Sequence, residues 1–202
     1  MPPGQPPIQP AQPARRTGLI IGLLGAGLAV VLLAACGVGG FLWYRHQNQD
    51  QDLTGLVDYR TTNPEVLSQE HRTGDIDYPM TPPAGGPHNP SWQNCVGDVY
   101  AAPIEDSHAV HSLEHGAVWI TYRPDLAPAE VAQLANRVRG QSYLMLSPYP
   151  GQAAPISLQA WGYQLTVDKA DDKRIDTFIQ RYRETATIEP GAPCGGGVTT
   201  TR

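Results

Sequence analysis

The strongest constraint on this chain is an apolar segment near its N-terminus that carries no charged side chain. Residues 17–44 read TGLIIGLLGAGLAVVLLAACGVGGFLWY, and a helix needs about 20 apolar residues to cross the hydrocarbon core of a bilayer. Arg15 and Arg16 precede the segment, and RHQNQDQD follows it. Because positive charge collects on the cytoplasmic side, we expect one transmembrane helix with a cytoplasmic N-terminus and the rest of the chain outside.

A second interpretation of the same segment starts from LAAC, residues 33–36. This tetrapeptide resembles the lipobox of bacterial lipoproteins, in which the cysteine, here Cys36, is lipidated after signal cleavage. A lipoprotein continues with polar residues, whereas GVGGFLWY prolongs the apolar run to a spanning length. The uncleaved anchor in the cell membrane is therefore favoured, and both interpretations place the chain beyond about residue 45 outside the cytoplasm.

The segments around the apolar run differ in composition. Residues 1–16 are rich in proline and of low complexity, which predicts a disordered cytoplasmic tail. Residues 45–75 are polar with little periodicity, which is typical of a stalk. We expect an extracytoplasmic domain over residues 76–190 and a glycine-rich tail over residues 191–202.

The charge distribution argues against a nucleic-acid partner. The formal net charge is -5, and the 14 Lys and Arg are scattered along the chain. Binding to a phosphate backbone requires basic residues gathered into one patch or stripe. The membrane is therefore the partner that the sequence indicates, and no protein partner is specified.

Two cysteines lie beyond the apolar segment, Cys95 and Cys194. In an oxidising compartment two such thiols form a structural disulfide more often than they stay free. We therefore expect a Cys95–Cys194 disulfide. The alternative, Cys95 as a thiolate metal ligand, lacks any CxxC spacing.

The outer part of the chain alternates helical and strand patterns. Gly116 can end a two-turn helix over residues 108–115, with Asp106 or Ser107 as its cap, and AVWITY then reads as a strand. Further helices are expected over PDLAPAEVAQLANRVRG and DDKRIDTFIQRYRET, and further strands over SYLMLS and over ISLQAWGYQLTV as one continuous strand. The last two strands, joined by a turn, predict an antiparallel pair. The fold class expected is α+β, with a small mixed or antiparallel sheet and two packed helices.

A histidine cluster marks the candidate site. On a helix His108, His111 and His115 lie at i, i+3 and i+7 and project to one side. Histidines at i and i+4 offer two ligands to zinc or copper, and His88 in GGPHNP could fold back as a third. Glu114 would be a fourth ligand or would support the histidines.

The choice between zinc and copper depends on soft donors. Met80 and Met145 could supply sulfur to copper. Met145 lies within a predicted strand, SYLMLS, and is expected in the core instead. The sequence therefore leaves both metals open.

Two alternatives to a metal-binding domain remain. HSLEH matches HxxEH, the inverted zinc-peptidase motif in which the glutamate polarises water. The helix break at Gly116 and the short chain count against a hydrolase, whose remote acidic ligand would have to be Glu184 or Glu189. The other alternative is a non-enzymatic structural or interaction module of the cell envelope, in which the histidines hydrogen-bond and pack. We assign no catalytic residues, and the expectation leans away from an enzyme.

Several blocks of the chain carry a family resemblance. PPAGGPHNPSW, GDVY, VHSLEHGAVWITYRP, SPYPG and AWGYQL, behind one N-terminal span, resemble a bacterial membrane-anchored family, domain of unknown function 3105. The resemblance covers about residues 76–183. It implies an extracytoplasmic domain on a single anchor and supplies no activity. The signature positions that match are His88, His111, Glu114, His115 and Gly116.

Overall fold

The computed structural model describes residue 40 and residues 53–202. The chain divides into two compact units, Met1–Asp50 and Gln51–Arg202, and the second is the domain described below. The predicted tail over residues 1–16 and the predicted span over residues 17–44, Cys36 included, lie outside the described residues except for residue 40. Among the described helices, none has the length and apolar character needed to cross a membrane.

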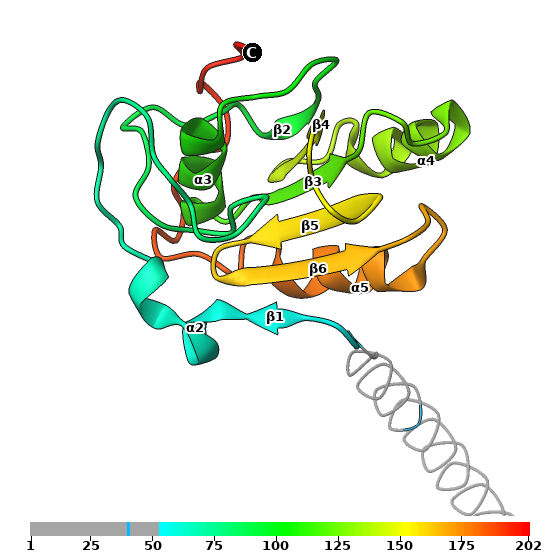
Figure 1. Ribbon diagram of the computed structural model, residues 1–202, viewed down its shortest axis with the longest axis horizontal. Helices are drawn as coiled ribbons and strands as arrows, with labels where there is room; N and C mark the ends of the chain where they lie inside the picture. Colours follow the sequence, from blue (N-terminus) through cyan, green and yellow to red (C-terminus); the bar gives the residue numbers. More distant parts are fainter. Residues whose placement is uncertain (1–39, 41–52) are drawn as a thin grey trace, which may run out of the picture. The chain divides into compact units, whose positions relative to one another are not determined.

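A six-stranded mixed sheet organises the domain, in the order β1-β6-β5-β3-β4-β2 (Figure 1). Its strands are β1 (Val57–Asp58), β2 (Val96–Val99), β3 (Val118–Tyr122), β4 (Leu144–Pro148), β5 (Ile156–Ala160) and β6 (Tyr163–Val167). β4 pairs in parallel with both β2 and β3, whereas β5 pairs antiparallel with β3 and β6, and β1 antiparallel with β6. The expected α+β class with a mixed sheet is confirmed.

The parallel pairing of β3 with β4 follows from the helix between them. α4 spans Pro128–Val138, starts with proline at a first-turn position and is followed by Gly140 at φ +70°. A parallel pair needs a long crossover connection, and a helix is the usual one. The proline start and the glycine stop that predict this helix are both confirmed.

The expected pairing of the last two strands is wrong. ISLQAWGYQLTV is a hairpin of β5 and β6 rather than one strand, and β3 lies between β4 and β5. The hairpin turns at Trp161 and Gly162, where Gly162 has φ +80°, a conformation that tight hairpins demand and glycine adopts readily. The dipeptide WG therefore divides an apolar run that otherwise reads as continuous.

Helices cover both faces of the sheet. α4 and α5 (Lys173–Tyr182) pack on one face, and α5 lies behind β5 and β6 in Figure 1. α3 (Asp106–Glu114) packs on the other face, together with long loops. Because side chains alternate along a strand, Val118 and Ile120 of β3 join the α4 and α5 core, whereas Trp119 joins the α3 core. The two packed helices expected from sequence thus share one face, and α3 forms a third layer.

Part of the predicted stalk belongs to the folded domain. β1 pairs with β6, and it is followed by α2 (Tyr59–Thr62) and the 3-10 helix η1 (Pro64–Val66). Asp58 caps α2, accepting from the backbone N–H of Arg60 at 2.9 Å. A two-residue strand is too short to give an alternating pattern, so the sequence shows no sign of it.

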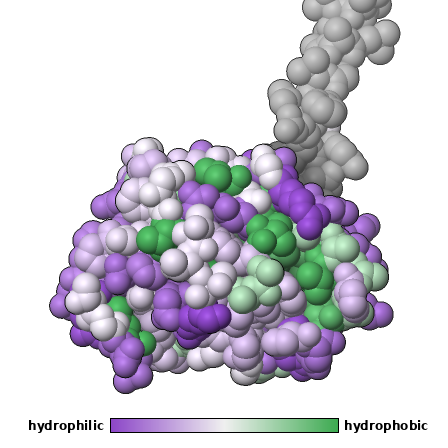
Figure 2. Space-filling view, turned by 90° about the horizontal axis from the view of Figure 1, so that it is seen from above, coloured by the Kyte–Doolittle hydropathy of each residue, from purple (hydrophilic) through white to green (hydrophobic). Residues whose placement is uncertain are grey.

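The glycine-rich tail also packs onto the domain. Cys194 forms a disulfide with Cys95, as expected, and Val198 makes a β-bridge with Gln93. Figure 2 shows a face on which hydrophilic residues predominate and hydrophobic ones form separate areas. Val57 and Val96, on the two edge strands, are the exposed large hydrophobic side chains among the described residues.

α3 begins and ends close to its predicted bounds, but its predicted cap is wrong. Asp106 and Ser107 lie inside the helix, and Glu105 occupies the N-cap position without a side-chain hydrogen bond. The Asp106 carboxylate instead accepts from the hydroxyl of Tyr149 at 2.8 Å. Gly116 follows the helix at φ +104°, as its role as a stop predicts.

Gly116→Ala is expected to lower the free energy of unfolding by more than about 1 kcal/mol, because a side chain strains the left-handed conformation. Its Cβ would also lie 3.0 Å from the Cα of Glu184. Gly140→Ala is the control, since Gly140 has φ +70° but open space around its Cβ position. Urea titration followed by tryptophan fluorescence measures both; an equal loss in the two variants would exclude the steric contribution at Gly116.

Removing the disulfide is expected to lower the free energy of unfolding by about 2–5 kcal/mol, because it closes a long loop in the unfolded chain. The sequence separation of its cysteines is 99 residues. The double variant Cys95→Ser/Cys194→Ser and the reduced wild type should show the same loss. A reductant that leaves the wild-type unfolding curve in place would contradict this expectation.

Candidate metal centre

α3 brings the histidine-rich segment into the interior of the domain. His111, Glu114 and His115 are all buried, with 3–4 % of their surface exposed. The apolar side of the helix, with Val110 and Leu113, packs in the core with Trp119. Three polar side chains are therefore held where water does not supply their hydrogen bonds.

Backbone carbonyls fix the histidine rings. Nδ1 of His88 lies 2.8 Å from the carbonyl of Gly86, Nδ1 of His111 lies 2.6 Å from that of Asn89, and Nδ1 of His115 lies 2.8 Å from that of Pro193. A carbonyl only accepts, so each Nδ1 carries the proton. In a neutral ring this leaves Nε2 with a free lone pair, which is the arrangement that metal-binding histidines use.

Four side chains converge in a first cluster, here called the His71 group: His71, His88, His111 and Glu114. Their ligand atoms lie within 4.8 Å of one another. Oε2 of Glu114 is 2.8 Å from Nε2 of His88 and 3.7 Å from Nε2 of His71. The ring of His71 stacks on that of His111 with centroids 4.9 Å apart.

A short β-bridge delivers His71 to this cluster. His71 and His88 pair in parallel. The backbone N–H of Arg72 donates to the carbonyl of His88 at 2.8 Å, and the backbone N–H of His88 donates to the carbonyl of Glu70 at 2.9 Å. The segment before the predicted domain thus supplies a ligand candidate. Sequence reasoning missed His71 because it stands alone in a polar stretch, and its residue type was the one available signal.

Three side chains form a second cluster, here called the Glu189 group: His111, His115 and Glu189. Nε2 of His115 lies 3.5 Å from Oε2 of Glu189, and the rings of His111 and His115 meet edge to face with centroids 4.6 Å apart. Glu189 is half-exposed. His111 belongs to both groups.

Burial and charge set the protonation of the site. Burial, together with the charges of the neighbouring His115, His88 and His71, lowers the pKa of His111 to about 4, against the hydrogen bond to the carbonyl of Asn89, which raises it. Burial raises the pKa of Glu114, but the close approach of the His88 ring and the nearby rings of His111 and His71 outweigh burial and hold the pKa below its usual value. Near neutral pH the site therefore presents neutral His111 beside an ionised Glu114, and metal binding requires ligands in these forms.

The surroundings of His88 provide the clearest test of whether these residues suit a metal ion. Its side chain is fully buried, and its Nε2 has no hydrogen-bond partner of acceptable geometry although Oε2 of Glu114 is 2.8 Å away. With the proton on Nδ1, a neutral ring directs a lone pair toward a carboxylate, which is unfavourable. A cation bound to both atoms removes the repulsion, and ligand atoms on one ion lie about 3 Å apart.

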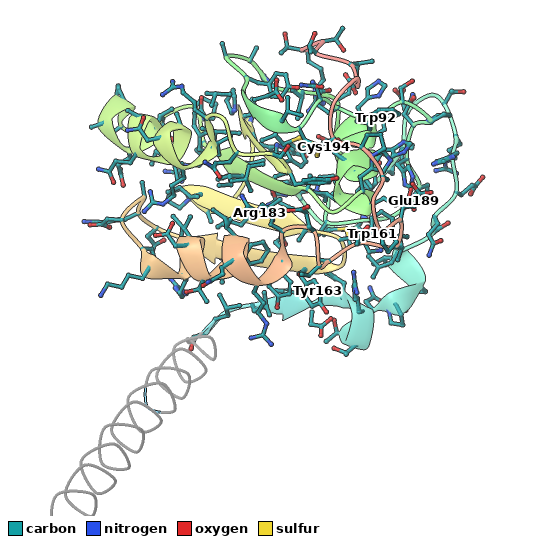
Figure 3. The ribbon with its side chains drawn as sticks, turned by 180° about the vertical axis from the view of Figure 1, so that it is seen from behind. Trp92, Trp161, Tyr163, Arg183, Glu189 and Cys194 are labelled. Atoms are coloured by element: carbon teal, nitrogen blue, oxygen red, sulfur yellow. A yellow bond between two sulfur atoms is a disulfide. The ribbon has the colours of Figure 1, made fainter. Side chains whose placement is uncertain are left out.

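Aromatic side chains wall the two groups. Trp92 lies 5.0 Å from the ring of His115, and Trp161 lies edge-on to His88 at 5.7 Å between centroids. Figure 3 shows Trp92, Trp161 and Glu189 at the same end of the domain. Apolar walls lower the local dielectric and so strengthen electrostatic interactions within the site.

The structure divides the expected ligand set. His88, His111 and Glu114 come together, but His115 lies with Glu189 and does not share a group with His88. His108 belongs to neither group, and its Nδ1 bonds to the carbonyl of Ser91 instead.

The HxxEH residues are arranged only in part as the peptidase motif requires. His111 and His115 lie together with Glu189, one of the two remote acidic ligands considered for a hydrolase. The motif also needs its glutamate to act on water at the ion, whereas Oε2 of Glu114 lies 2.8 Å from Nε2 of His88. Met80 and Met145 are buried among the hydrophobic side chains of the core.

Comparison with curated proteins finds no match, and neither does comparison with solved structures. A protein family described as a protein of unknown function, DUF3105, matches residues 69–196. This range extends beyond the expected one at both ends, and it contains every residue of the His71 and Glu189 groups together with both cysteines of the disulfide. Since the match covers more than half of the chain, the protein belongs to the DUF3105 family.

Proposed function

We propose that this domain binds one transition-metal ion, zinc or copper, through the His71 group. The Nε2 atoms of His71, His88 and His111 and the carboxylate of Glu114 supply the ligands. The observation that carries the proposal is His88, a fully buried imidazole whose free nitrogen faces an ionised carboxylate. Holding that pair without a cation is costly in the interior.

The donor set selects the class of ion. Both cysteines of the described chain are joined in the disulfide, so no thiolate is available there. Three imidazole nitrogens and one carboxylate suit Zn(II) and Cu(II) better than the soft ion Cu(I) or the hard ions Mg(II) and Ca(II). Cu(II) and Zn(II) are therefore the ions to test.

We further propose that the domain works outside the cytoplasm on a single membrane anchor. The Cys95–Cys194 disulfide supports this location, because such bonds persist in oxidising compartments. The charge-free run over residues 17–44 supplies a segment long enough for the anchor.

A structural role for the cluster is the second candidate. The contact of 2.8 Å between His88 and Glu114 also suits an ion pair with a protonated imidazole. In that case the cluster would brace α3 against the loop that carries His88, and no metal would be needed. The two candidates differ in what happens when metal is added.

His71→Ala is expected to weaken binding of Zn(II) or Cu(II) by at least about tenfold, because it removes a ligand from the ion. His71 is about half-exposed, so its loss disturbs packing little. His108→Ala is the matched control, since the His108 ring bonds the carbonyl of Ser91 and lies outside both groups. Isothermal titration calorimetry should show one ion per wild-type chain and unchanged affinity in the control. A wild type that binds neither ion would contradict the metal site and favour the structural role of the cluster.

Metal is also expected to stabilise the fold. An ion that binds only the folded chain at a free concentration of 100 times Kd adds about 2.7 kcal/mol of stability. Tm should therefore rise when Zn(II) is added to chelator-treated protein. It should fall back to the metal-free value when EDTA is then added. The structural role predicts the same Tm in all three samples.

A further inference from the structure

The Glu189 group offers a second place for the same ion. Its three donors, His111, His115 and Glu189, include two buried imidazoles with anchored Nδ1 atoms. The backbone near Glu189 is fixed to the end of α3, because the hydroxyl of Thr187 donates to the carbonyl of Glu114 at 2.7 Å. The N–H of Ile188 donates to the same carbonyl at 3.3 Å. A half-exposed carboxylate is thus carried on an ordered segment beside two ring nitrogens.

His111 makes the two groups mutually exclusive as complete sites. Its Nδ1 is bound to the carbonyl of Asn89, which leaves Nε2 as its one free nitrogen. A nitrogen lone pair binds one ion at a time. An ion in the His71 group therefore leaves the Glu189 group with His115 and Glu189 alone. An ion in the Glu189 group leaves the His71 group without His111.

The number of donors ranks the two positions. The His71 group has four donors, of which His88, His111 and Glu114 are buried, whereas the Glu189 group has three donors and ends in a half-exposed carboxylate. Four ligands complete the tetrahedral shell that zinc prefers, and three leave a coordination position open to water or another ligand. The four donors of the His71 group suit stable binding of an ion, and the three donors of the Glu189 group suit its exchange.

We propose that the domain holds a single ion in either of two adjacent positions that share His111, so that the ion moves between them by ligand exchange. Bonds to His115 and Glu189 break as bonds to His71, His88 and Glu114 form, and the ion keeps its oxidation state throughout. This inference rests on the proposed metal-binding function. It makes the domain a carrier that can receive or release an ion through the Glu189 group.

Zinc titration of variants in the full chain tests the second position. The double variant His71→Ala/Glu114→Gln disables the His71 group, and it is expected to retain one weaker site. Adding Glu189→Gln to this background should weaken the remaining site by at least about tenfold. Glu184→Gln is the matched control, because Glu184 is an exposed glutamate on the same segment that belongs to neither group.

His71→Ala/His88→Ala provides a second background for the same comparison, because it leaves the His71 group with two donors, in case the first double variant does not fold. In either background, equal affinity of the Glu189→Gln and Glu184→Gln variants overturns the second position. Two tightly bound ions per wild-type chain would overturn the sharing of His111. A wild type that binds neither Zn(II) nor Cu(II) would instead refute the proposed function itself, so the two failures can be told apart.

Release kinetics test the carrier role. In the otherwise wild-type chain, Glu189→Gln should leave the zinc affinity within about twofold of that of Glu184→Gln, because the ion rests in the His71 group. Transfer of bound zinc to a competing chelator should be at least about threefold slower, because the exchange position is damaged. Equal transfer rates in the two variants would show that the ion does not pass through Glu189.

Discussion

The end of α3 is the point on which the rest of the domain depends. Gly116 turns the chain from the helix into β3, and the N–H of Glu184 donates to its carbonyl at 2.8 Å. Thr187 and Ile188 bond to the carbonyl of Glu114 in the same place. These contacts join the C-terminal segment to α3, and they hold the Glu189 side chain beside His115.

Most regular elements could be predicted because their signals are local. A proline start, a glycine stop and an apolar face define α4, and AVWITY is strand-like by composition alone. The arrangement of strands could not be predicted from local signals. A two-residue turn at Trp161 and Gly162 lies inside an apolar run, so β5 and β6 read as one strand. The insertion of β3 between β4 and β5 is a long-range pairing that no local pattern shows.

The candidate site was predictable where its residues are adjacent in the sequence. His111, Glu114 and His115 sit within one and a half turns of helix, and His88 follows from its Gly- and Pro-rich loop. His71 arrives through an isolated β-bridge, and the division of the ligands into two groups follows from the directions of individual rings. Neither the bridge nor the ring directions leave a periodic trace in the sequence.

The two edges of the sheet have a consequence for how this protein behaves at high local density. β1 has two residues, and β2 has four with an irregular register at Gly97, where φ is +95°. Edge strands that are short or irregular present few free backbone groups in line, which disfavours edge-to-edge pairing between copies. At high local concentration the domain would therefore pair less readily through these edges, while His71 and Glu189 stay about half-exposed to solvent on each copy.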